Sequence, residues 1–279
     1  MKNVFVAVLP LFLLISCHRN NIREQQQWAE IFTRNGADSG CFELADNSHE
    51  QVFYYNLDRA SRRYSPASTF KIVNSLIALE TDVAPDENMV IAWDGIVRPR
   101  AEWNKDMNMR EAFAISCLPY YQEIARRIGA IEMQKWVDTL NYGNRRIGGK
   151  IDEFWLNDTL MISADEQVGL MKKLYFDKLP FAQRTQRIVR NLMLREDSLA
   201  YRLYYKTGTS VHGNHTMGWL VGFIERKEVQ KGVLTHTEET NYKPYFFAMN
   251  CETADTTKDV MAMRLNILKD VLRERQILK

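Results

Sequence analysis

An apolar run from Phe70 to Leu79 is the feature that most constrains how this chain folds. The run reads Phe-Lys-Ile-Val-Asn-Ser-Leu-Ile-Ala-Leu and is apolar nearly all round, which is typical of a helix buried on every side. Ser65 and Pro66, just before it, predict the helix start as an N-cap followed by a proline at the first helical position. Lys71, the only charged residue of the run, is therefore expected to be buried.

Ser68 lies three residues before Lys71, so the two side chains share one face of the predicted helix. Its first-turn position surrounds the serine with free amide groups and with the positive end of the helix dipole. A serine hydroxyl is a poor nucleophile at neutral pH and needs a base close by. Ser-x-x-Lys alone is weak evidence for a nucleophile with its base, because a serine at a helix start and a solvated lysine are both common. The buried context favours a nucleophile with its base.

A second motif, Lys206-Thr207-Gly208, closes a strand-like run about one domain further along. Lys-Thr-Gly is much rarer by chance than Ser-x-x-Lys. Together the two motifs place a serine beside two lysines, which can supply a nucleophile, a base and a cationic anchor for acyl transfer.

Strand signals gather at the two ends of the chain, and the middle reads mainly as helices and loops. Short connections favour an antiparallel arrangement. We therefore expect an α+β fold, an α/β sandwich in which an antiparallel sheet is flanked by helices and carries a mostly helical second lobe. The expected strands are 41–45, 51–56, 201–206, 217–225 and 245–250, with a helix over 258–275; the sheet lobe covers about 28–65 and 195–279, and the helical lobe about 66–194.

Composition fits one catalytic domain over residues 18–279. The chain has 279 residues, of which 46% are hydrophobic and 26% charged, enough for a full core. Its net charge is +2 and its arginine pairs are scattered, so no basic stripe predicts a nucleic-acid partner. Cys41, Cys117 and Cys251 show no Cys-x-x-Cys spacing and are expected to be buried thiols.

Residues 1–17 differ from everything after them and predict a lipoprotein-type signal peptide. Lys2 precedes an apolar stretch over 4–15, which is too short for a membrane-spanning helix and the right length for a secretory signal. The ending Leu14-Ile15-Ser16-Cys17 resembles a bacterial lipobox, although a signal peptide that merely contains a cysteine is the alternative. We expect an exported protein on the periplasmic side, tethered to the outer membrane only by lipidation of Cys17.

Further motifs occur in a fixed order between and after the first two. With the serine–lysine helix and Lys-Thr-Gly, they resemble the class D, oxacillinase-type serine β-lactamases along nearly the whole mature chain. The resemblance implies a serine β-lactamase and penicillin-binding transpeptidase-like fold, β-lactam antibiotics as substrates and resistance to penicillins. The motifs are Ser116-Cys117-Leu118, Tyr142-Gly143-Asn144, Phe154-Trp155-Leu156 and Trp219-Leu220-Val221-Gly222, with the Trp93-Asp94-Gly95, Trp103-Asn104 and Leu179-Pro180-Phe181 neighbourhoods.

The resemblance also implies the chemistry of the base. Ser68 would be the acyl-enzyme nucleophile, and Lys71 would be N6-carboxylysine, formed from carbon dioxide or bicarbonate. Burial agrees with this, since desolvation favours the neutral amine that reacts with carbon dioxide. The Trp155 indole N–H would hold the carbamate in an apolar pocket made with Phe70, Leu118 and Leu156. No diffusible cofactor and no metal is implied.

The remaining roles also follow from the resemblance. Ser116 would pass protons between the carbamate, Lys206 and the departing ring nitrogen, and the backbone amides of Ser68 and Thr209 would form the oxyanion hole. The chain departs from the family pattern at Leu118, where valine is usual, and at Thr209, where an aromatic residue is frequent. The implied substrate-binding residues are Lys206, Thr207, Gly208, Thr209, Arg264 and Leu118, while Tyr142-Gly143-Asn144 would be a structural wall.

Three alternatives remain at this stage. A β-lactam-sensing, penicillin-binding domain shares the fold and stays acylated, but such receptors normally carry several transmembrane helices and a signalling domain. A D,D-peptidase would lack the carbamate support that Trp155 implies. A metallo-hydrolase would use His212 and His215, a pair that a turn between strands explains better. The preferred β-lactams and the oligomeric state do not follow from the sequence.

Overall fold

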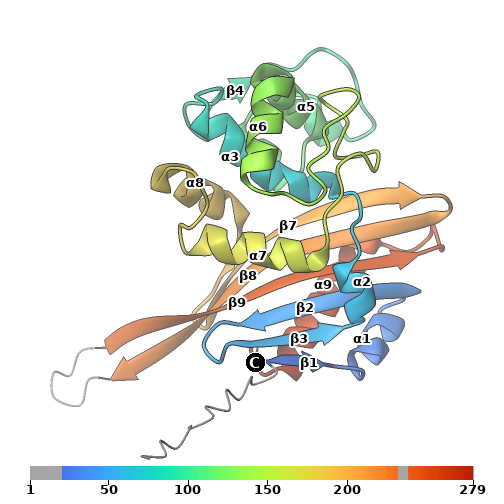
Figure 1. Cartoon of the computed structure of the whole chain (residues 1–279), viewed down its shortest axis with the longest axis vertical. Helices are drawn as coiled ribbons and strands as arrows, with labels where there is room; N and C mark the ends of the chain where they lie inside the picture. The colour runs from blue at the N-terminus through green and yellow to red at the C-terminus, as the bar shows by residue number, and fades with distance from the viewer. Residues whose placement is uncertain (1–20, 232–237, 279) are drawn as a thin grey trace, which may run out of the picture.

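The strands expected at the two ends of the chain meet in one sheet. The computed structural model describes residues 21–231 and 238–278, and its main sheet has seven strands in the order β1-β3-β2-β9-β8-β7-β6 (Figure 1). This confirms the predicted α+β class. The strands are β1 (Ile22–Glu24), β2 (Ser39–Asp46), β3 (Gln51–Tyr55), β6 (Leu194–Asp197), β7 (Tyr201–His212), β8 (His215–Lys231) and β9 (Glu238–Thr253).

All pairings in this sheet are antiparallel except one. β2 joins β9 antiparallel, with Cys41 opposite Asn250, so the N-terminal hairpin adds to the C-terminal strands. β1 pairs parallel with β3 and was not predicted. Its three residues are exposed and show no apolar alternation. β7, β8 and β9 also run beyond their predicted ends, because backbone pairing continues into polar segments such as Arg226-Lys227-Glu228.

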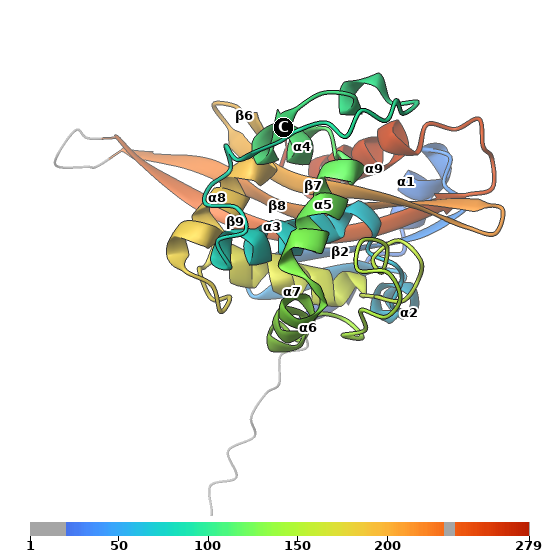
Figure 2. The same cartoon turned by 90° about the horizontal axis from the view of Figure 1, so that it is seen from above.

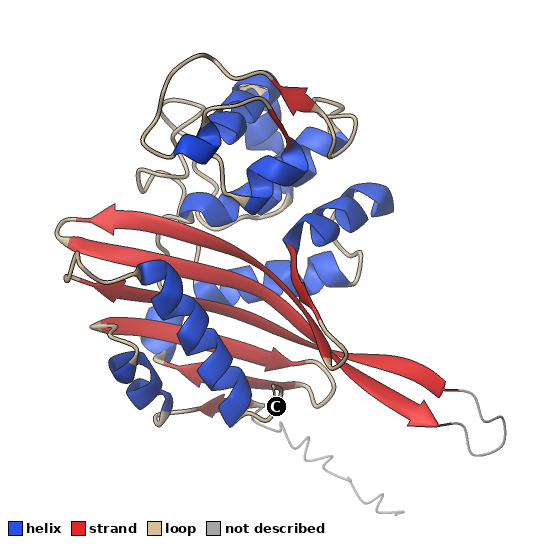
Figure 3. Cartoon of the chain, turned by 180° about the vertical axis from the view of Figure 1, so that it is seen from behind, coloured by secondary structure: helices blue, strands red, loops and turns tan. Residues whose placement is uncertain are grey.

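One face of the sheet is covered by the first and last helices, α1 (Trp28–Arg34) and α9 (Val260–Glu274) (Figure 3). Asp259 is the N-cap of α9, and its carboxylate accepts hydrogen bonds from the amides of Met261 and Ala262. Its buried side chains form a core with α1 and with the sheet residues that point to this face. The predicted C-terminal helix is therefore present, two residues later than expected at its start.

The other face carries a larger core and the helices of the middle segment (Figures 1 and 2). α7 lies directly against β2, β8 and β9, and the helices drawn above it form the second lobe. All residues of α3 from Lys71 to Leu79 are buried, as the apolar run predicts. These elements are α2 (Leu57–Ser61), the 3₁₀ turns η1 (Ala67–Phe70) and η2 (Ala101–Trp103), α3 (Lys71–Glu80), α4 (Met109–Ala114), α5 (Leu118–Ile128), α6 (Ala130–Thr139), α7 (Ala164–Tyr175), α8 (Gln183–Met193) and the small pair β4 (Val90–Ile91) and β5 (Met107–Asn108).

The three cysteines after residue 20 are buried free thiols, as expected. Within residues 21–231 and 238–278, no helix is long and apolar enough to cross a membrane. The predicted signal peptide and Cys17 lie outside the described residues.

Candidate active site

The nucleophile turn begins differently from the sequence prediction. The Ser65 hydroxyl does not cap the helix; it donates a hydrogen bond to the Trp155 carbonyl at 2.9 Å. Pro66 occupies the N-cap position of η1, and α3 starts only at Lys71. The Ala67 amide donates to the same Trp155 carbonyl at 3.0 Å, with Ala67 at a φ of 47°. Ser68 is thus held in a 3₁₀ turn tied to the tryptophan loop, which specifies its position better than a cap would.

Lys71 lies beside Ser68 in a desolvated position. Its Nζ donates to Ser68 Oγ at 2.7 Å, and the residue is 1% exposed. Burial lowers the pKa of Lys71 to about 7, against the opposing effect of Cys117 and with a smaller contribution from the charge of Arg100. The amine is therefore poised to lose its proton near neutral pH, next to the hydroxyl it contacts.

Ser116 and Lys206 form a second serine–lysine contact. Lys206 Nζ donates to Ser116 Oγ and to the Thr207 carbonyl, both at 2.9 Å. Burial and then the neighbouring Lys71 charge hold the pKa of Lys206 well below its usual value. Ser116 has a φ of 58°, a left-handed conformation uncommon for a non-glycine residue and found often at functional sites. The two contacts involve all four residues that the sequence predicted to act together, and the charge of Lys71 lowers the pKa of Lys206.

Gly208 lets strand β7 approach the nucleophile turn. A Cβ at this position would lie 2.8 Å from the Pro66 carbonyl oxygen and 3.3 Å from the Ser68 nitrogen, so a larger residue would push the strand away. From the next strand, the Trp219 indole donates to the Ser65 carbonyl at 2.9 Å. The Lys-Thr-Gly and Trp219 motifs therefore hold the sheet against the serine.

Trp155 is fully buried, and its indole N–H has no hydrogen-bond partner among the described residues. Its ring stacks on the ring of Phe70, the residue directly before Lys71, with the ring centroids 5.6 Å apart. It also contacts the Phe154 ring edge-on, at a centroid distance of 5.0 Å. An unpaired buried N–H costs about 1–3 kcal/mol. An apolar pocket, a buried lysine of lowered pKa and this free donor fit a carboxylated lysine. Leu118, at the start of α5, is half-buried against the same core.

Arg264 reaches this region from α9, on the opposite face of the sheet. It is 2% exposed, and its Nη1 donates to the Gly208 carbonyl and, at 3.1 Å, to the hydroxyl of exposed Thr209. Burial lowers its pKa to about 10. Gly218 makes room for α9, because a Cβ there would lie 2.5 Å from Val260. The Arg264 guanidinium thus lies at the end of the Lys-Thr-Gly segment and is hydrogen-bonded to β7.

Two arginines near the site were missed by the sequence analysis. Arg100, exposed on the loop before α4, donates to the Ile115 carbonyl at 3.3 Å, and its charge lowers the pKa of both Lys71 and Lys206. Arg195 lies over the rings of Phe113 at 5.7 Å and Tyr205 at 5.8 Å, and also lowers the pKa of Lys206. Neither belongs to a motif, so no sequence signal marked them. Both add positive potential at Lys206 that suits an anionic substrate, with Arg100 also paired to Glu102 at 2.6 Å.

The Tyr142-Gly143-Asn144 motif lies beside the nucleophile turn, and Tyr142 and Gly143 also line a second cavity against α7. Gly143 has a φ of 53°, and a Cβ there would lie 1.9 Å from the Met161 carbonyl oxygen, so this close turn requires glycine. The Asn144 side chain donates to the Thr159 carbonyl at 2.8 Å and accepts from the Met161 amide at 3.0 Å. Tyr142 packs edge-on against Phe70 at 5.6 Å. These contacts are structural.

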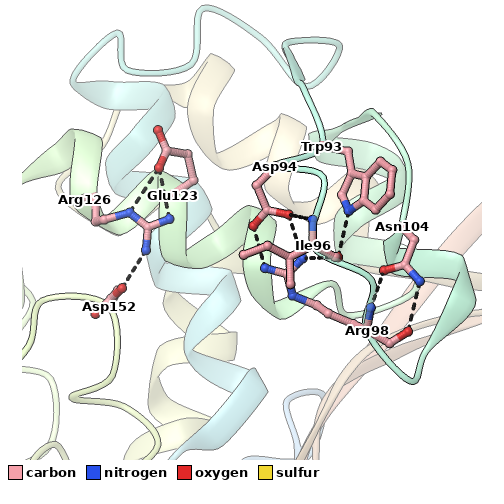
Figure 4. A network of polar contacts seen from close by, with 8 residues as sticks. All are labelled: Trp93, Asp94, Ile96, Arg98, Asn104, Glu123, Arg126 and Asp152. Atoms are coloured by element: carbon pink, nitrogen blue, oxygen red, sulfur yellow. Dashed lines mark hydrogen bonds and ion pairs between the residues drawn. The ribbon is translucent and has the colours of Figure 1, made fainter.

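A polar network holds the loop carrying the Trp93-Asp94-Gly95 motif (Figure 4). The Trp93 indole donates to the Ile96 carbonyl at 3.0 Å, and Asp94 forms an ion pair with Arg98 at 2.6 Å. The Asn104 side chain closes the loop on the backbone of Arg98, accepting from its amide at 2.9 Å and donating to its carbonyl at 2.9 Å. The loop and α5 flank a pocket of about 190 Å³ that Trp103 and Cys117 help to line.

The described residues contain no group of three or more histidine, cysteine, aspartate or glutamate side chains placed to hold a metal ion. The side chain of His212 lies outside what the structure describes, so the histidine pair of the metallo-hydrolase alternative has no geometry to weigh.

We compared the chain with known protein families, sequences and structures. The family model of the penicillin-binding protein transpeptidase domain matches residues 29–260. The chain is 39% identical to the β-lactamase OXA-48 of Klebsiella pneumoniae, over 92% of this chain and 90% of that one. Solved class D β-lactamases from Sebaldella termitidis (TM-score 0.83, 33% identity) and Fusobacterium nucleatum (TM-score 0.82, 36% identity) each match 92% of this chain, and 99% and 100% of their own.

Replacing Lys71 by methionine should remove a pH dependence of stability. The pKa of Lys71 falls from 10.5 to about 7 on folding, so between these values the unfolded chain keeps a proton that the folded chain has released. The free energy of unfolding should therefore gain up to about 1.4 kcal/mol per pH unit over this range from Lys71 alone. Urea unfolding from pH 7 to 10 in bicarbonate-free buffer measures it. Exposed Lys178→Met should keep the wild-type slope, and an unchanged slope for Lys71→Met would contradict the assignment.

Proposed function

This chain belongs to the class D β-lactamases, hydrolases that act on β-lactams, and we propose that it opens penicillins through an acyl-enzyme on Ser68 and so confers resistance to them. The observation that carries the proposal is the pair of serine–lysine contacts, Lys71 Nζ to Ser68 Oγ at 2.7 Å and Lys206 Nζ to Ser116 Oγ at 2.9 Å. A hydroxyl bonded to a buried amine of lowered pKa is an activated nucleophile.

In acylation, Ser68 gives its hydroxyl proton to the base at Lys71, and its Oγ attacks the carbonyl carbon of the β-lactam ring. The backbone amides of Ser68 and Thr209 would donate to the oxygen that becomes negative, and Gly208 supports this by bringing β7 within contact of the turn. The ring nitrogen takes a proton as its bond to the carbonyl carbon breaks. Ser116 is the donor for that step, and Lys206 behind it, at 2.9 Å, replaces the proton.

The Lys-Thr-Gly segment of β7, with the positive charge of Lys206, recognises the carboxylate beside the β-lactam ring. Lys206 supplies a charge, Thr207 and Thr209 supply hydrogen-bond donors, and Arg264 holds Thr209 from below at 3.1 Å. Burial, and then repulsion from Lys71 and the arginines, lowers the pKa of Lys206, and the attraction of an incoming anion would raise it again. Binding of an anionic substrate is thus coupled to protonation of the lysine that later serves the leaving group.

Lys71 is proposed to be carboxylated on Nζ by carbon dioxide or bicarbonate. Its burial, its pKa of about 7 and the free indole N–H of Trp155 support this modification. When present, the carbamate supplies a carboxylate-like base beside Ser68. The chain's own contribution is to keep the Lys71 amine neutral and dry, to offer the Trp155 donor and to enclose both with Phe70 and Phe154.

Location is a further part of the proposal. Residues 1–17 would direct export, and lipidation of Cys17 would hold the mature enzyme on the periplasmic side of the outer membrane, where β-lactams arrive. The support is the lipobox-like Leu14-Ile15-Ser16-Cys17, in a segment outside the described residues.

Ser68→Ala should abolish acylation, because the nucleophile is lost. It should leave the fold intact, because Ser68 is half-buried and the substitution removes no atom of the hydrophobic core. Intact-protein mass spectrometry with a slowly turned over penicillin should show one covalent adduct on the wild type and none on the variant. Ser61→Ala, at an exposed hydroxyl, should behave as the wild type. An adduct that persists in Ser68→Ala would disprove the assignment.

Trp155→Phe should weaken carboxylation of Lys71 while keeping an apolar ring at the site. Losing a hydrogen bond to a charged group costs about 1.5–3 kcal/mol, so the bicarbonate concentration for half-carboxylation should rise roughly ten- to a hundredfold. Carbon-13 NMR with labelled bicarbonate reports the carbamate signal directly. Trp136→Phe, a partly buried tryptophan of α6, is the control. No carbamate signal in the wild type, or equal bicarbonate dependence in both variants, would count against the modification.

Cys17→Ser should release the protein from the membrane or leave it as unprocessed precursor, because the acceptor of the lipid is removed. Fractionation and N-terminal mass spectrometry test this. A wild-type protein that is fully soluble and begins at a residue other than 17 would rule out the anchor.

A further inference from the structure

A second cavity, of about 390 Å³, lies on the sheet face beneath α7 and contains none of the residues assigned to catalysis. Strands β2 and β3 form its floor, α7 forms one side, and the segment around Leu140 and Ile162 forms another. Its lining is mostly apolar. Three acidic residues, Glu43, Asp165 and Glu166, and two lysines, Lys172 and Lys173, also line it.

Glu43 is the unusual group of this cavity. Its side chain is 2% exposed, yet Oε2 has no hydrogen-bond partner among the described residues. Its neighbours across the sheet are Tyr54 on β3 and Ala248 on β9, and neither brings a positive charge. Burial, with the negative charge of Asp165, raises the pKa of Glu43 to about 8, against the opposing effect of a hydrogen bond from the Tyr54 side chain. A buried carboxyl oxygen facing a cavity without a donor is costly unless a ligand supplies one.

Asp165 extends the acidic character to the mouth of the cavity. It is exposed, and Oδ1 accepts a hydrogen bond from the Tyr54 hydroxyl at 3.2 Å. Burial raises the pKa of Tyr54, so the phenol stays protonated between the two carboxyl groups. Glu166, the next acid on α7, is already engaged by Arg63 Nε at 3.0 Å. The negative charge of Asp165 therefore lies at the mouth of the cavity, and Glu43, with a pKa of about 8, adds a second negative charge when it ionises.

Gly169 leaves the mouth open. It lies inside α7, one turn after Asp165, where glycine costs about 1 kcal/mol of helix stability relative to alanine. A Cβ at this position would meet nothing within 4 Å, so no neighbour requires the glycine. It is also one of the residues that line the cavity. The missing side chain thus widens access to the acidic floor.

We propose that this cavity is a binding site for a small organic ammonium ion, whose charged nitrogen bonds Glu43 and Asp165 and whose apolar body packs on Ala45, Val52 and Ile162. Calcium and magnesium need about six oxygen ligands. Two carboxyls and a phenol fall short of that number, and the apolar lining suits carbon better. The site is independent of the proposed function, because it shares no side chain with the serine–lysine contacts.

The ammonium should bind more tightly as pH rises, because it pairs with ionised Glu43. The other charged and titratable groups that line the cavity are Asp165, Glu166, Lys172 and Lys173 from α7, Tyr54 from β3 and Tyr142 from the turn after α6. With a pKa of about 8 for Glu43 in the free protein, affinity for a permanently charged amine should rise roughly tenfold between pH 7 and pH 9.

Calorimetric titration of the purified protein with n-butylammonium chloride, in amine-free phosphate–borate buffer, tests the site. Saturable binding is expected, with the isosteric neutral n-butanol at least tenfold weaker. Glu43→Gln should lower the affinity at least tenfold, and Gly169→Leu should block the mouth, while Gly169→Ala binds as the wild type. Penicillin hydrolysis should be unchanged in Glu43→Gln, which checks the fold.

Carbon-13 NMR of the wild type gives a test that needs no variant. Adding n-butylammonium should lower the apparent pKa of the Glu43 carboxyl, since a bound cation favours the ionised form. Equal affinity for n-butanol, unchanged binding in Glu43→Gln, an unmoved Glu43 titration, or displacement of the amine by millimolar magnesium would each overturn the proposal.

Discussion

Two lysine side chains, buried between the sheet and the helical lobe, are the feature on which the rest of this structure depends. Lys71 and Lys206 are almost fully buried, and each donates to the hydroxyl of a half-buried serine, at 2.7 and 2.9 Å. Burying an ammonium group is costly, and the molecule responds by lowering both pKa values instead of pairing the charges with carboxylates. The resulting neutral amine beside a serine is the chemical basis of the site.

The surrounding architecture keeps these lysines desolvated and in place. Gly208 allows β7 to touch the nucleophile turn, and the carbonyl of Trp155 holds that turn through Ser65 and Ala67. On the other side of the sheet, α9 sends Arg264 to the carbonyl of Gly208. Both layers of the sandwich therefore converge on one short segment of strand. A change in any of these contacts would move the Lys-Thr-Gly segment relative to the serine.

The cavity under α7 also buries an ionisable group, but this group is an acid, so burial raises its pKa where it lowers the pKa of the lysines. There the carboxyl of Glu43 is buried with one oxygen, Oε2, unpaired among the described residues, and its pKa rises to about 8, as that of Lys71 falls to about 7. Lys71 contacts a serine and lies in an apolar pocket with an unpaired indole donor, an arrangement suited to acyl transfer. Glu43 faces an open, mostly apolar space with Asp165 at its mouth. That arrangement suits recognition of a cation.

The sequence by itself determined the buried helix, the α+β class and the motifs that bring Ser68, Lys71, Ser116 and Lys206 together, because apolar periodicity and short motifs are local signals. It did not predict the 3₁₀ start at Ala67 or the strand β1, since Ser65 and Ile22 take their partners from segments distant in the chain. Arg100, Arg195 and the cavity at Glu43 also belong to the tertiary structure alone. A charge acts through space, and its neighbours exist only once the sheet and the lobe have packed together.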